Sequence, residues 1–328
     1  MGGPSAILIL RIIISNEGAS LSRVGTITAS AVLVLGLTAC TGGNGGSSAS
    51  EQPGNAAACP GTVTNVVVSV GQWGDIVERL GGDCTDVTTI VNAPSIDPHD
   101  FEPGTSDLAA FTGADVVVFN GAGYDSWAEN VLDTLDDEPV VISAAEVVGV
   151  RAGEDPHLWY DPTVVEQMAG AVTEGLISAS PEAGPYFADQ ARLWDAELQP
   201  YRDEVEQLRA VAAGHTYAAT ETVFDRMAAA VGLTDLTPEG YRRAVSNEGE
   251  PTPGDLAEFE AVLASGQVDV LVENTQTESE LSSQLMSAAK DGGVAFLAVT
   301  ESQPQAGGSF VEWQVAQLQE LTRAFGAP

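Results

Sequence analysis

Short runs of β-branched residues alternate with helical patterns along most of this 328-residue chain. Runs such as Val63–Val70 (VTNVVVSV) and Ala114–Asn120 (ADVVVFN) predict strands, and a segment such as Trp73–Gly81 (WGDIVERLG) predicts a helix. Strands that alternate with helices in this way are typical of βαβ units, in which neighbouring strands run parallel. The alternation therefore predicts an α/β fold with mainly parallel sheets.

The alternating segments form two groups, which predict two lobes, and a length of 328 residues agrees with two domains at about 100 to 200 residues each. We place the N-terminal lobe at residues 59–183 and the C-terminal lobe at residues 213–328. Between them, residues 184–212 have apolar positions three and four apart, which predict one long linking helix. Pro200 predicts a kink in that helix. The polar segment Thr237–Thr252 predicts a loop.

The first 58 residues predict export and anchoring. Arg23 precedes Val24–Leu37 (VGTITASAVLVLGL), a basic residue followed by an apolar stretch of signal-peptide length that is too short for a permanent membrane span. The sequence Leu37-Thr38-Ala39-Cys40 resembles the lipobox of bacterial lipoproteins, which implies removal of residues 1–39 and lipid attachment to Cys40. An ordinary cleaved signal with a chance cysteine is the alternative. Residues 40–58 are rich in Gly, Ser and Asn and predict a flexible tether.

The charge of the chain argues against nucleic acid as a partner. The sequence has 47 Asp and Glu against 12 Lys and Arg, a net charge of −35, and such a surface repels a polyanion. Removing residues 1–39 deletes two arginines and one glutamate, so 12 − 2 = 10 basic and 47 − 1 = 46 acidic residues remain. The acidity therefore belongs to the exported part. A charged ligand should be a cation, although most of the carboxylates serve as solvated surface.

Two cysteines remain after Cys40, namely Cys59 and Cys84. In an oxidising compartment, an even pair within a short region is typical of a disulfide. Two buried free thiols are the alternative.

Two of the three histidines occupy nearly duplicate motifs, Asp97-Pro98-His99 and Asp155-Pro156-His157. Imidazole is the commonest protein ligand for a transition metal, and a nearby carboxylate can hold the second ring nitrogen. The Asp-Pro pair sets each histidine in a turn at an element boundary, where open α/β sheets bind ligands. One motif alone favours a structural histidine, whereas the pair favours a shared metal site.

The two DPH motifs, the preceding VSVGQWGDIVERLGGD and the following FTGADVVVFNGAG resemble the zinc/manganese family of ABC-transporter solute-binding lipoproteins, cluster 9 or A-I. The resemblance runs from about Val63 to the carboxyl terminus. It implies two α/β lobes joined by one long helix, with a metal in the cleft between them. It also implies four ligands: His99, His157, Glu221 in AATETVF, and Glu301 in VTES, where many relatives have Asp.

The positions of the two glutamates agree with that ligand set. Glu221 follows the strand TYAAT and Glu301 follows the strand VAFLAV, so both lie at carboxyl ends of strands. Taken alone, Glu221 is equally well explained as a first-turn carboxylate that interacts with a helix dipole. His215 begins the strand before Glu221, roughly 20 Å away at the rise of an extended chain, so both cannot bind one ion.

Two imidazoles and two carboxylates nearly neutralise one divalent cation and leave little room for an activated water, which favours binding over catalysis. Mixed N and O ligands fit Mn²⁺ or Zn²⁺. The resemblance favours manganese, because zinc-specific members tend to have a third histidine and a histidine-rich loop, and residues 138–154 contain no histidine. We expect a monomeric, extracytoplasmic receptor that delivers metal to an ABC permease. A surface adhesin with a structural metal is the alternative, and a metallohydrolase is less favoured because the chain has no HExxH motif.

Overall fold

The computed structural model describes residues 59–93, 95–96, 101–136, 138–247, 249–277, 279–304 and 308–326. The predicted signal peptide, the lipidation site Cys40, the tether up to residue 58 and the candidate ligand His99 lie outside the described residues. Within the described part of the chain, no helix combines the length and the apolar character that a membrane crossing requires.

The N-terminal lobe is built on a four-stranded parallel sheet with the strand order β2-β1-β3-β4. The strands are β1 (Thr64–Val70), β2 (Thr85–Val91), β3 (Val116–Phe119) and β4 (Val140–Ser143). The central strands β1 and β3 are rich in valine and buried, as expected for a parallel sheet that is covered on both faces. The helices of this lobe are α1 (Gly71–Gly81), α2 (Thr105–Thr112), α3 (Ser126–Leu132), α4 (Ala144–Val148) and α5 (Pro162–Ala179).

The C-terminal lobe repeats this strand order in a second four-stranded parallel sheet, β6-β5-β7-β8. Its strands are β5 (Thr216–Ala219), β6 (Thr234–Asp235), β7 (Val270–Asn274) and β8 (Ala295–Val299). Its helices are α8 (Asp225–Val231), α9 (Glu239–Val245), α10 (Pro253–Ala264), α11 (Glu280–Gly292) and α12 (Phe310–Ala324). In both sheets the order in which strands are added reverses next to the first strand, between β1 and β3 in the N-terminal lobe and between β5 and β7 in the C-terminal lobe. Open α/β sheets bind ligands at such a point. The prediction of two parallel α/β lobes is confirmed.

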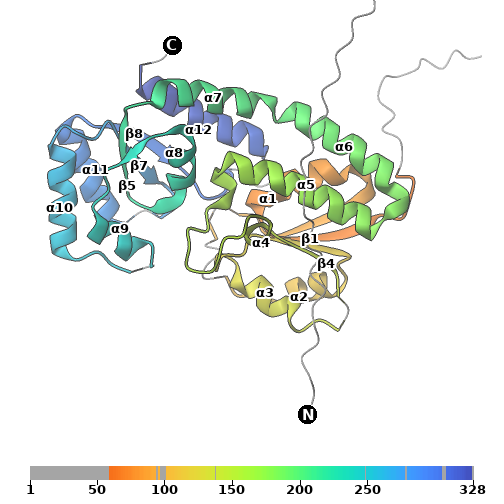
Figure 1. The fold of residues 1–328 in the computed structure, drawn as a ribbon. Helices are drawn as coiled ribbons and strands as arrows, with labels where there is room; N and C mark the ends of the chain where they lie inside the picture. The colour runs from red at the N-terminus through yellow and green to blue at the C-terminus, as the bar shows by residue number, and fades with distance from the viewer. Residues whose placement is uncertain are drawn as a thin grey trace, which may run out of the picture. The chain divides into compact units, whose positions relative to one another are not determined.

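Two consecutive helices form the predicted linking segment: α6 (Gly184–Glu197) and α7 (Gln199–Ala212). The helix is interrupted at Leu198, which separates α6 from α7. Leu198 lies two residues before Pro200, the residue that predicts a kink. Figure 1 shows the pair extending from the N-terminal lobe to the C-terminal lobe, with α12 lying alongside α7. The linking segment is therefore part of the packed structure.

The prediction of a loop across residues 237–252 is wrong, because α9 lies within it. Tyr241 is 3% exposed and its ring packs edge-on against Phe259 of α10 at a centroid distance of 4.7 Å. The other side chains of α9 are mostly charged, so a single aromatic anchor holds a helix that a search for apolar periodicity does not detect. The short elements α4 and β6 were likewise not predicted.

The larger apolar core is continuous between the lobes. It includes Val68 of β1, Leu208 of α7, Val272 of β7 and Leu318 of α12, all almost fully buried. A smaller core fills the other face of the C-terminal sheet, where Phe259 of α10 and Leu285 of α11 pack with Tyr241 of α9. Because the lobes share most of their core, they are not independently packed units joined by a flexible linker.

Cys59 and Cys84 are joined by a disulfide, with their Cα atoms 4.9 Å apart. Cys84 directly precedes β2, and Cys59 lies a few residues before β1. The bond therefore fastens the amino ends of two neighbouring strands, whereas Glu221 and Glu301 follow the carboxyl ends of β5 and β8.

Candidate metal-binding site

Three of the four candidate ligands lie in the described part of the chain, and they come from two lobes. His157 lies in the loop before the 3-10 turn Leu158–Tyr160 and α5, whereas Glu221 and Glu301 follow β5 and β8. The negative charges of both glutamates contribute to the pKa of His157, so the three groups interact electrostatically. Among the described residues, no three His, Cys, Asp or Glu side chains are grouped closely enough to hold a metal ion. His157, Glu221 and Glu301 therefore do not form such a group by themselves.

The loop that contains His157 is fixed by hydrogen bonds to the two residues that precede it, Asp155 and Pro156. The Nδ1 atom of His157 lies 2.6 Å from Asp155 Oδ1. The amide of the buried Asn120 donates to the carbonyl oxygen of Pro156 at 2.9 Å. Because a carboxylate holds Nδ1, the neutral ring carries its proton there and leaves Nε2 as the atom available to bind a metal.

Opposing effects set the protonation of His157. Burial of the imidazole acts to lower its pKa, but the hydrogen bond and charge of Asp155 and the charges of Glu301 and Glu221 outweigh burial. The net effect is a raised pKa for His157. A metal that binds His157 must displace a proton that the acidic surroundings favour.

All four oxygens of the two candidate carboxylates accept hydrogen bonds from neutral donors. Asn274, at the carboxyl end of β7, donates through Nδ2 to Glu221 Oε2 at 2.7 Å and to Glu301 Oε1 at 2.8 Å. The Thr277 hydroxyl donates to Glu221 Oε1, and the Tyr124 hydroxyl donates to Glu301 Oε2 at 3.1 Å. Within the described ranges, neither acidic side chain forms an ion pair with a Lys or Arg, and these neutral donors orient both of them.

Burial raises the pKa of Glu221, and the charge of Glu301 adds to this effect, while hydrogen bonds from Thr277 and Asn274 partly oppose it. The raised pKa reflects a negative charge that is removed from water and lies near a second carboxylate, which the charge of His157 only partly offsets. A divalent cation bound between these groups would relieve both effects, because it becomes the largest local charge in the site.

Each lobe contributes a residue that supports a candidate ligand of the other lobe. Arg226 of α8 lies 3.2 Å through Nε from Asp155 Oδ2, and Asp155 in turn holds His157. In the opposite direction, Tyr124 of the N-terminal lobe donates to Glu301. The orientation of the ligands consequently depends on both lobes being in contact.

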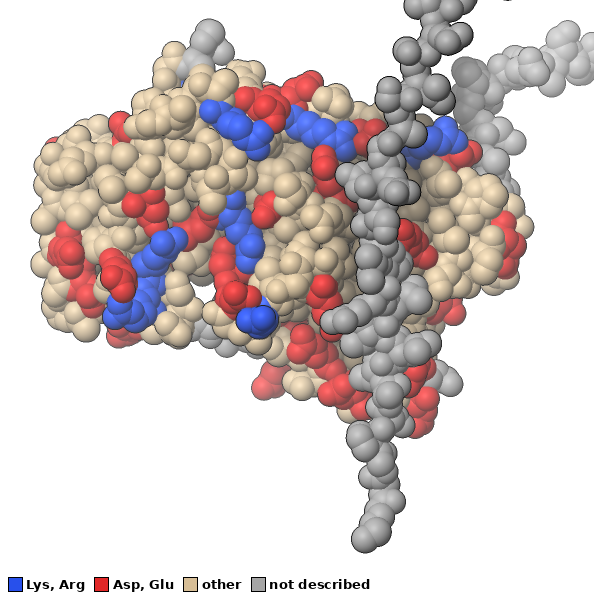
Figure 2. Space-filling view, in the orientation of Figure 1, with Lys and Arg blue, Asp and Glu red and all other residues tan. Residues whose placement is uncertain are grey.

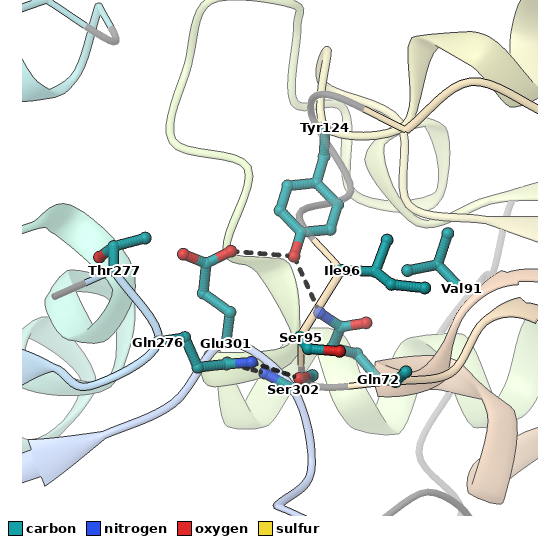
Figure 3. A pocket seen from close by; sticks show the side chains of 10 residues that line it. Gln72, Val91, Ser95, Ile96, Tyr124, Gln276, Thr277, Glu301 and Ser302 are labelled. Atoms are coloured by element: carbon teal, nitrogen blue, oxygen red, sulfur yellow. Dashed lines mark hydrogen bonds between the residues drawn. The ribbon is translucent and has the colours of Figure 1, made fainter.

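A pocket of about 110 Å³ lies beside Glu301, lined by both lobes (Figure 3). Gln72, Ser95 and Ile96 line it from the N-terminal side, and Gln276 and Ser302 line it from the C-terminal side. Sites for organic ligands usually enclose about 300 to 1,000 Å³, so this volume suits an ion with its waters better than an organic molecule. Ser95 and Ile96 precede residues 97–100, and therefore His99, by a few positions.

His215 has a different environment. Its Nδ1 atom lies 3.1 Å from Asp269 Oδ2, and its ring stacks on Phe325 at a centroid distance of 4.3 Å. It precedes β5, whereas Glu221 follows that strand, so the two lie at opposite ends of the strand. This arrangement agrees with the expectation that His215 is not a ligand beside Glu221.

Tyr124, Asn274 and Thr277 are site residues that the sequence motifs do not predict. Each follows or ends a strand at the edge where the candidate ligands lie, which is the signal that would have found them. Figure 2 shows that, on the face drawn there, acidic side chains are scattered over both lobes and basic side chains lie beside acidic ones. The general acidity therefore does not mark the site.

Two parallel α/β lobes with candidate ligands at their facing strand ends define the class of two-lobed solute-binding proteins. Residues 66–324 match the family model described as zinc-uptake complex component A, periplasmic, and since this match spans most of the sequence, the chain belongs to that family. The family consists of solute-binding proteins that work with the permeases of ABC metal importers outside the cytoplasm. The predicted family resemblance is thus confirmed.

Among curated relatives, the manganese-binding lipoprotein MntA of Halalkalibacterium halodurans is 25% identical over 236 residues, which cover 70% of this chain and 76% of the relative. The zinc-binding lipoprotein AdcA of Streptococcus pneumoniae is 20% identical over 282 residues, 78% of this chain, and is longer, so that only 55% of it is covered.

Solved structures share the fold. The periplasmic zinc-binding protein TroA of Treponema pallidum superimposes with a TM-score of 0.68 at 18% identity, covering 81% of this chain and 100% of TroA. The laminin-binding protein Lmb of Streptococcus agalactiae, described as bifunctional with adhesin and metal-transporting activity, gives a TM-score of 0.67 at 22% identity, covering 80% and 99%.

Proposed function

We propose that this chain captures one Mn²⁺ or Zn²⁺ ion outside the cytoplasm and delivers it to the permease of an ABC importer. The observation that carries the proposal is the arrangement of His157 with two donor-held carboxylates from the opposite lobe. The charges of Asp155, Glu301 and Glu221 raise the pKa of His157, and burial with the charge of Glu301 raises the pKa of Glu221, so a bound cation would be favourable to both carboxylates of the site.

The proposed ligands are His99, His157, Glu221 and Glu301. Two neutral imidazoles and two carboxylates bring two negative charges to one divalent cation, so the loaded site is close to neutral. Four protein ligands complete a tetrahedral shell for Zn²⁺ without an open position for an activated water. The oxygen ligands equally suit Mn²⁺, which binds carboxylates readily but has lower intrinsic affinity than Zn²⁺ for most sites. Glu221 in place of a third imidazole favours manganese.

The proposal also covers the segments at the amino end. Residues 1–39 act as a lipoprotein signal peptide, Cys40 carries the lipid, and residues 40–58 tether the folded part to the membrane. The lobes occupy residues 59–183 and 213–328, with residues 184–212 linking them, and the receptor works as a monomer. Mass spectrometry of the amino-terminal peptide tests the anchor: a lipidated Cys40 supports it, and an unmodified Cys40 overturns it.

Metal titration of the purified mature protein tests the central claim. After removal of bound metal, calorimetry with Mn²⁺ and with Zn²⁺ should give one ion per chain and a large rise in thermal stability. His157→Ala and Glu301→Ala should abolish binding, whereas His215→Ala is the matched control that should leave it unchanged. Unchanged binding in Glu301→Ala would overturn the ligand assignment.

The same preparation separates the alternatives. Metal-dependent hydrolysis of phosphate or carboxylic esters would favour a metallohydrolase. Adhesion to laminin that persists in Glu301→Ala would favour an adhesin, the activity for which Lmb is described.

A further inference from the structure

The loop that follows β3 has an unusual backbone. Gly121, Ala122 and Gly123 have consecutive φ angles of 76°, 56° and 93°, and Ala122 is the one non-glycine residue with a positive φ in the described part of the chain. Left-handed backbone is unfavourable for an alanine, and such residues persist only where the surrounding structure imposes them. A conformation of this kind points to a specific task for the next residue, Tyr124.

A buried carboxylate holds this loop in shape. Asp125 is fully buried and accepts hydrogen bonds from the backbone N–H groups of Asn120 and Gly121, both at 2.8 Å, and from the Ser69 hydroxyl. Burial without a cationic partner is costly for a carboxylate, and it raises the pKa of Asp125 despite these hydrogen bonds. Both the backbone and the buried carboxylate therefore work against stability, which indicates that the position of this loop matters.

The loop directs Tyr124 across the boundary between the lobes. The side chain is fully buried and packs against Trp159 at a centroid distance of 4.9 Å and near His157 at 6.2 Å. Its Oη accepts a hydrogen bond from Gln72 Nε2 at 2.9 Å and donates to Glu301 Oε2 at 3.1 Å. Figure 3 shows this chain of contacts from Gln72 through Tyr124 to Glu301. Because the amide of Gln72 donates, the hydroxyl proton of Tyr124 is directed towards the carboxylate.

We infer that Tyr124 is a positioning residue that holds the metal ligand Glu301 from the opposite lobe and thereby makes tight metal binding depend on contact between the lobes. The inference rests on the proposed function, because it takes Glu301 as a ligand.

The geometry explains how one hydrogen bond has this effect. Asn274 holds Glu301 Oε1 from within the C-terminal lobe, and Tyr124 holds Oε2 from the other lobe. A carboxylate oxygen has a second lone pair, so both donors can remain while Glu301 binds a metal. If the lobes separate, Glu301 loses one of these two donors and its orientation is less fixed. Separation then weakens binding at the moment when the ion is to be released.

Tyr124→Phe removes the hydroxyl and keeps the ring that packs against Trp159. We expect Mn²⁺ and Zn²⁺ to bind about tenfold more weakly, as is typical when a hydrogen-bond partner of a metal ligand is lost. Tyr217→Phe is the matched control, since the Tyr217 hydroxyl also donates to a carboxylate, Asp225 Oδ1 at 2.8 Å, away from the candidate ligands. Metal affinity in Tyr217→Phe should stay within about twofold of wild type.

A second measurement distinguishes positioning from a general loss of stability. A purely structural role would lower the melting temperature of metal-free Tyr124→Phe well below that of metal-free Tyr217→Phe and leave the affinity of the folded protein unchanged. Positioning predicts the reverse: comparable melting temperatures and weaker binding in Tyr124→Phe alone. If wild type binds metal and Tyr124→Phe binds it equally well, the inference is overturned and the proposed function stands. If wild type binds no metal, both are overturned.

Discussion

The two lobes share one strand order but supply different ligand chemistry. The sheets β2-β1-β3-β4 and β6-β5-β7-β8 are topologically equivalent, yet the candidate ligands are imidazoles on one side and carboxylates on the other. The ligand types are set by loops at the carboxyl ends of strands, which the pairing of the strands does not restrict. A repeated scaffold can therefore carry side chains of different chemistry in its two lobes, and under the proposed function these side chains match a cation in both charge and ligand type.

The lobes also hold their ligands differently. His157 depends on charged neighbours, Asp155 and behind it Arg226, whereas Glu221 and Glu301 depend on the neutral groups of Asn274, Thr277 and Tyr124. A charged partner raises the pKa of the imidazole, while the neutral donors do not prevent burial from raising the pKa of Glu221. Protonation of His157 therefore opposes metal binding in the N-terminal lobe, whereas the buried negative charge of Glu221 favours it in the C-terminal lobe.

The largest expected effect comes from removing one ligand from each lobe. His157→Ala and Glu221→Ala should each weaken metal binding at least about 1,000-fold, beyond the 10- to 100-fold typical of outer-shell changes.

Without metal at pH 7.5, the two variants should differ in stability. Glu221→Ala should be at least as stable as wild type, because it removes a buried charge, and His157→Ala should be less stable, because Asp155 loses one of its two charged partners and keeps only Arg226. Calorimetry measures the metal affinity, and urea unfolding in the presence of a chelator measures the stability without metal. If both variants lose the same amount of stability, the two lobes do not differ in how they hold their candidate ligands.

The disulfide lies in the N-terminal lobe, and its loss should separate stability from binding. The bond closes a separation of 25 residues, so Cys59→Ser with Cys84→Ser should lower the free energy of unfolding by about 3 kcal/mol. Because the bond joins the amino ends of strands, metal affinity should stay within about twofold of wild type. A strong loss of affinity in this variant would show that the ligands depend on the far edge of the sheet.

Much of this architecture can be predicted from the sequence, because it depends on local patterns. The valine runs of β1 and β3 identify buried parallel strands, and Pro200 marks the break between α6 and α7. The helix α9 was missed because one buried side chain, Tyr241, anchors an otherwise polar segment.

The candidate site was predicted less completely, because it depends on contacts between distant residues. The resemblance to the family supplied Glu221, which the sequence alone explains equally well as a first-turn carboxylate. The contact between Tyr124 and Glu301 joins residues 177 positions apart. The single amide of Asn274, at the end of β7, donates to two carboxylates that follow the strands on either side of β7. No local pattern predicts such pairings, because they arise from the pairing of strands distant in sequence and from the contact between the two lobes.

Lowering the pH should weaken metal binding, first through protonation of His157. The pKa of His157 is raised above its usual 6.5, so the protonated form persists to higher pH than for a free imidazole. A metal needs the neutral ring, and below that raised pKa the affinity should fall about tenfold per pH unit for the proton released. Titrations between pH 8 and pH 6 measure this slope, with His215→Ala as the control that should leave it unchanged. A flat profile would show that His157 is not a ligand.

The smallest expected effect concerns a cross-lobe contact beside the linking helices. Asp75 of α1 is buried and accepts a hydrogen bond through Oδ2 from the backbone N–H of Phe310, the first residue of α12, at 2.8 Å. Asp75→Ala leaves that N–H without its partner and should lower the free energy of unfolding by about 1 kcal/mol, as for the loss of a helix cap. Metal affinity should remain within about twofold of wild type, because the shared apolar core still joins the lobes there. A tenfold loss, like that expected for Tyr124→Phe, would instead show that any cross-lobe contact controls binding and that Tyr124 has no special role.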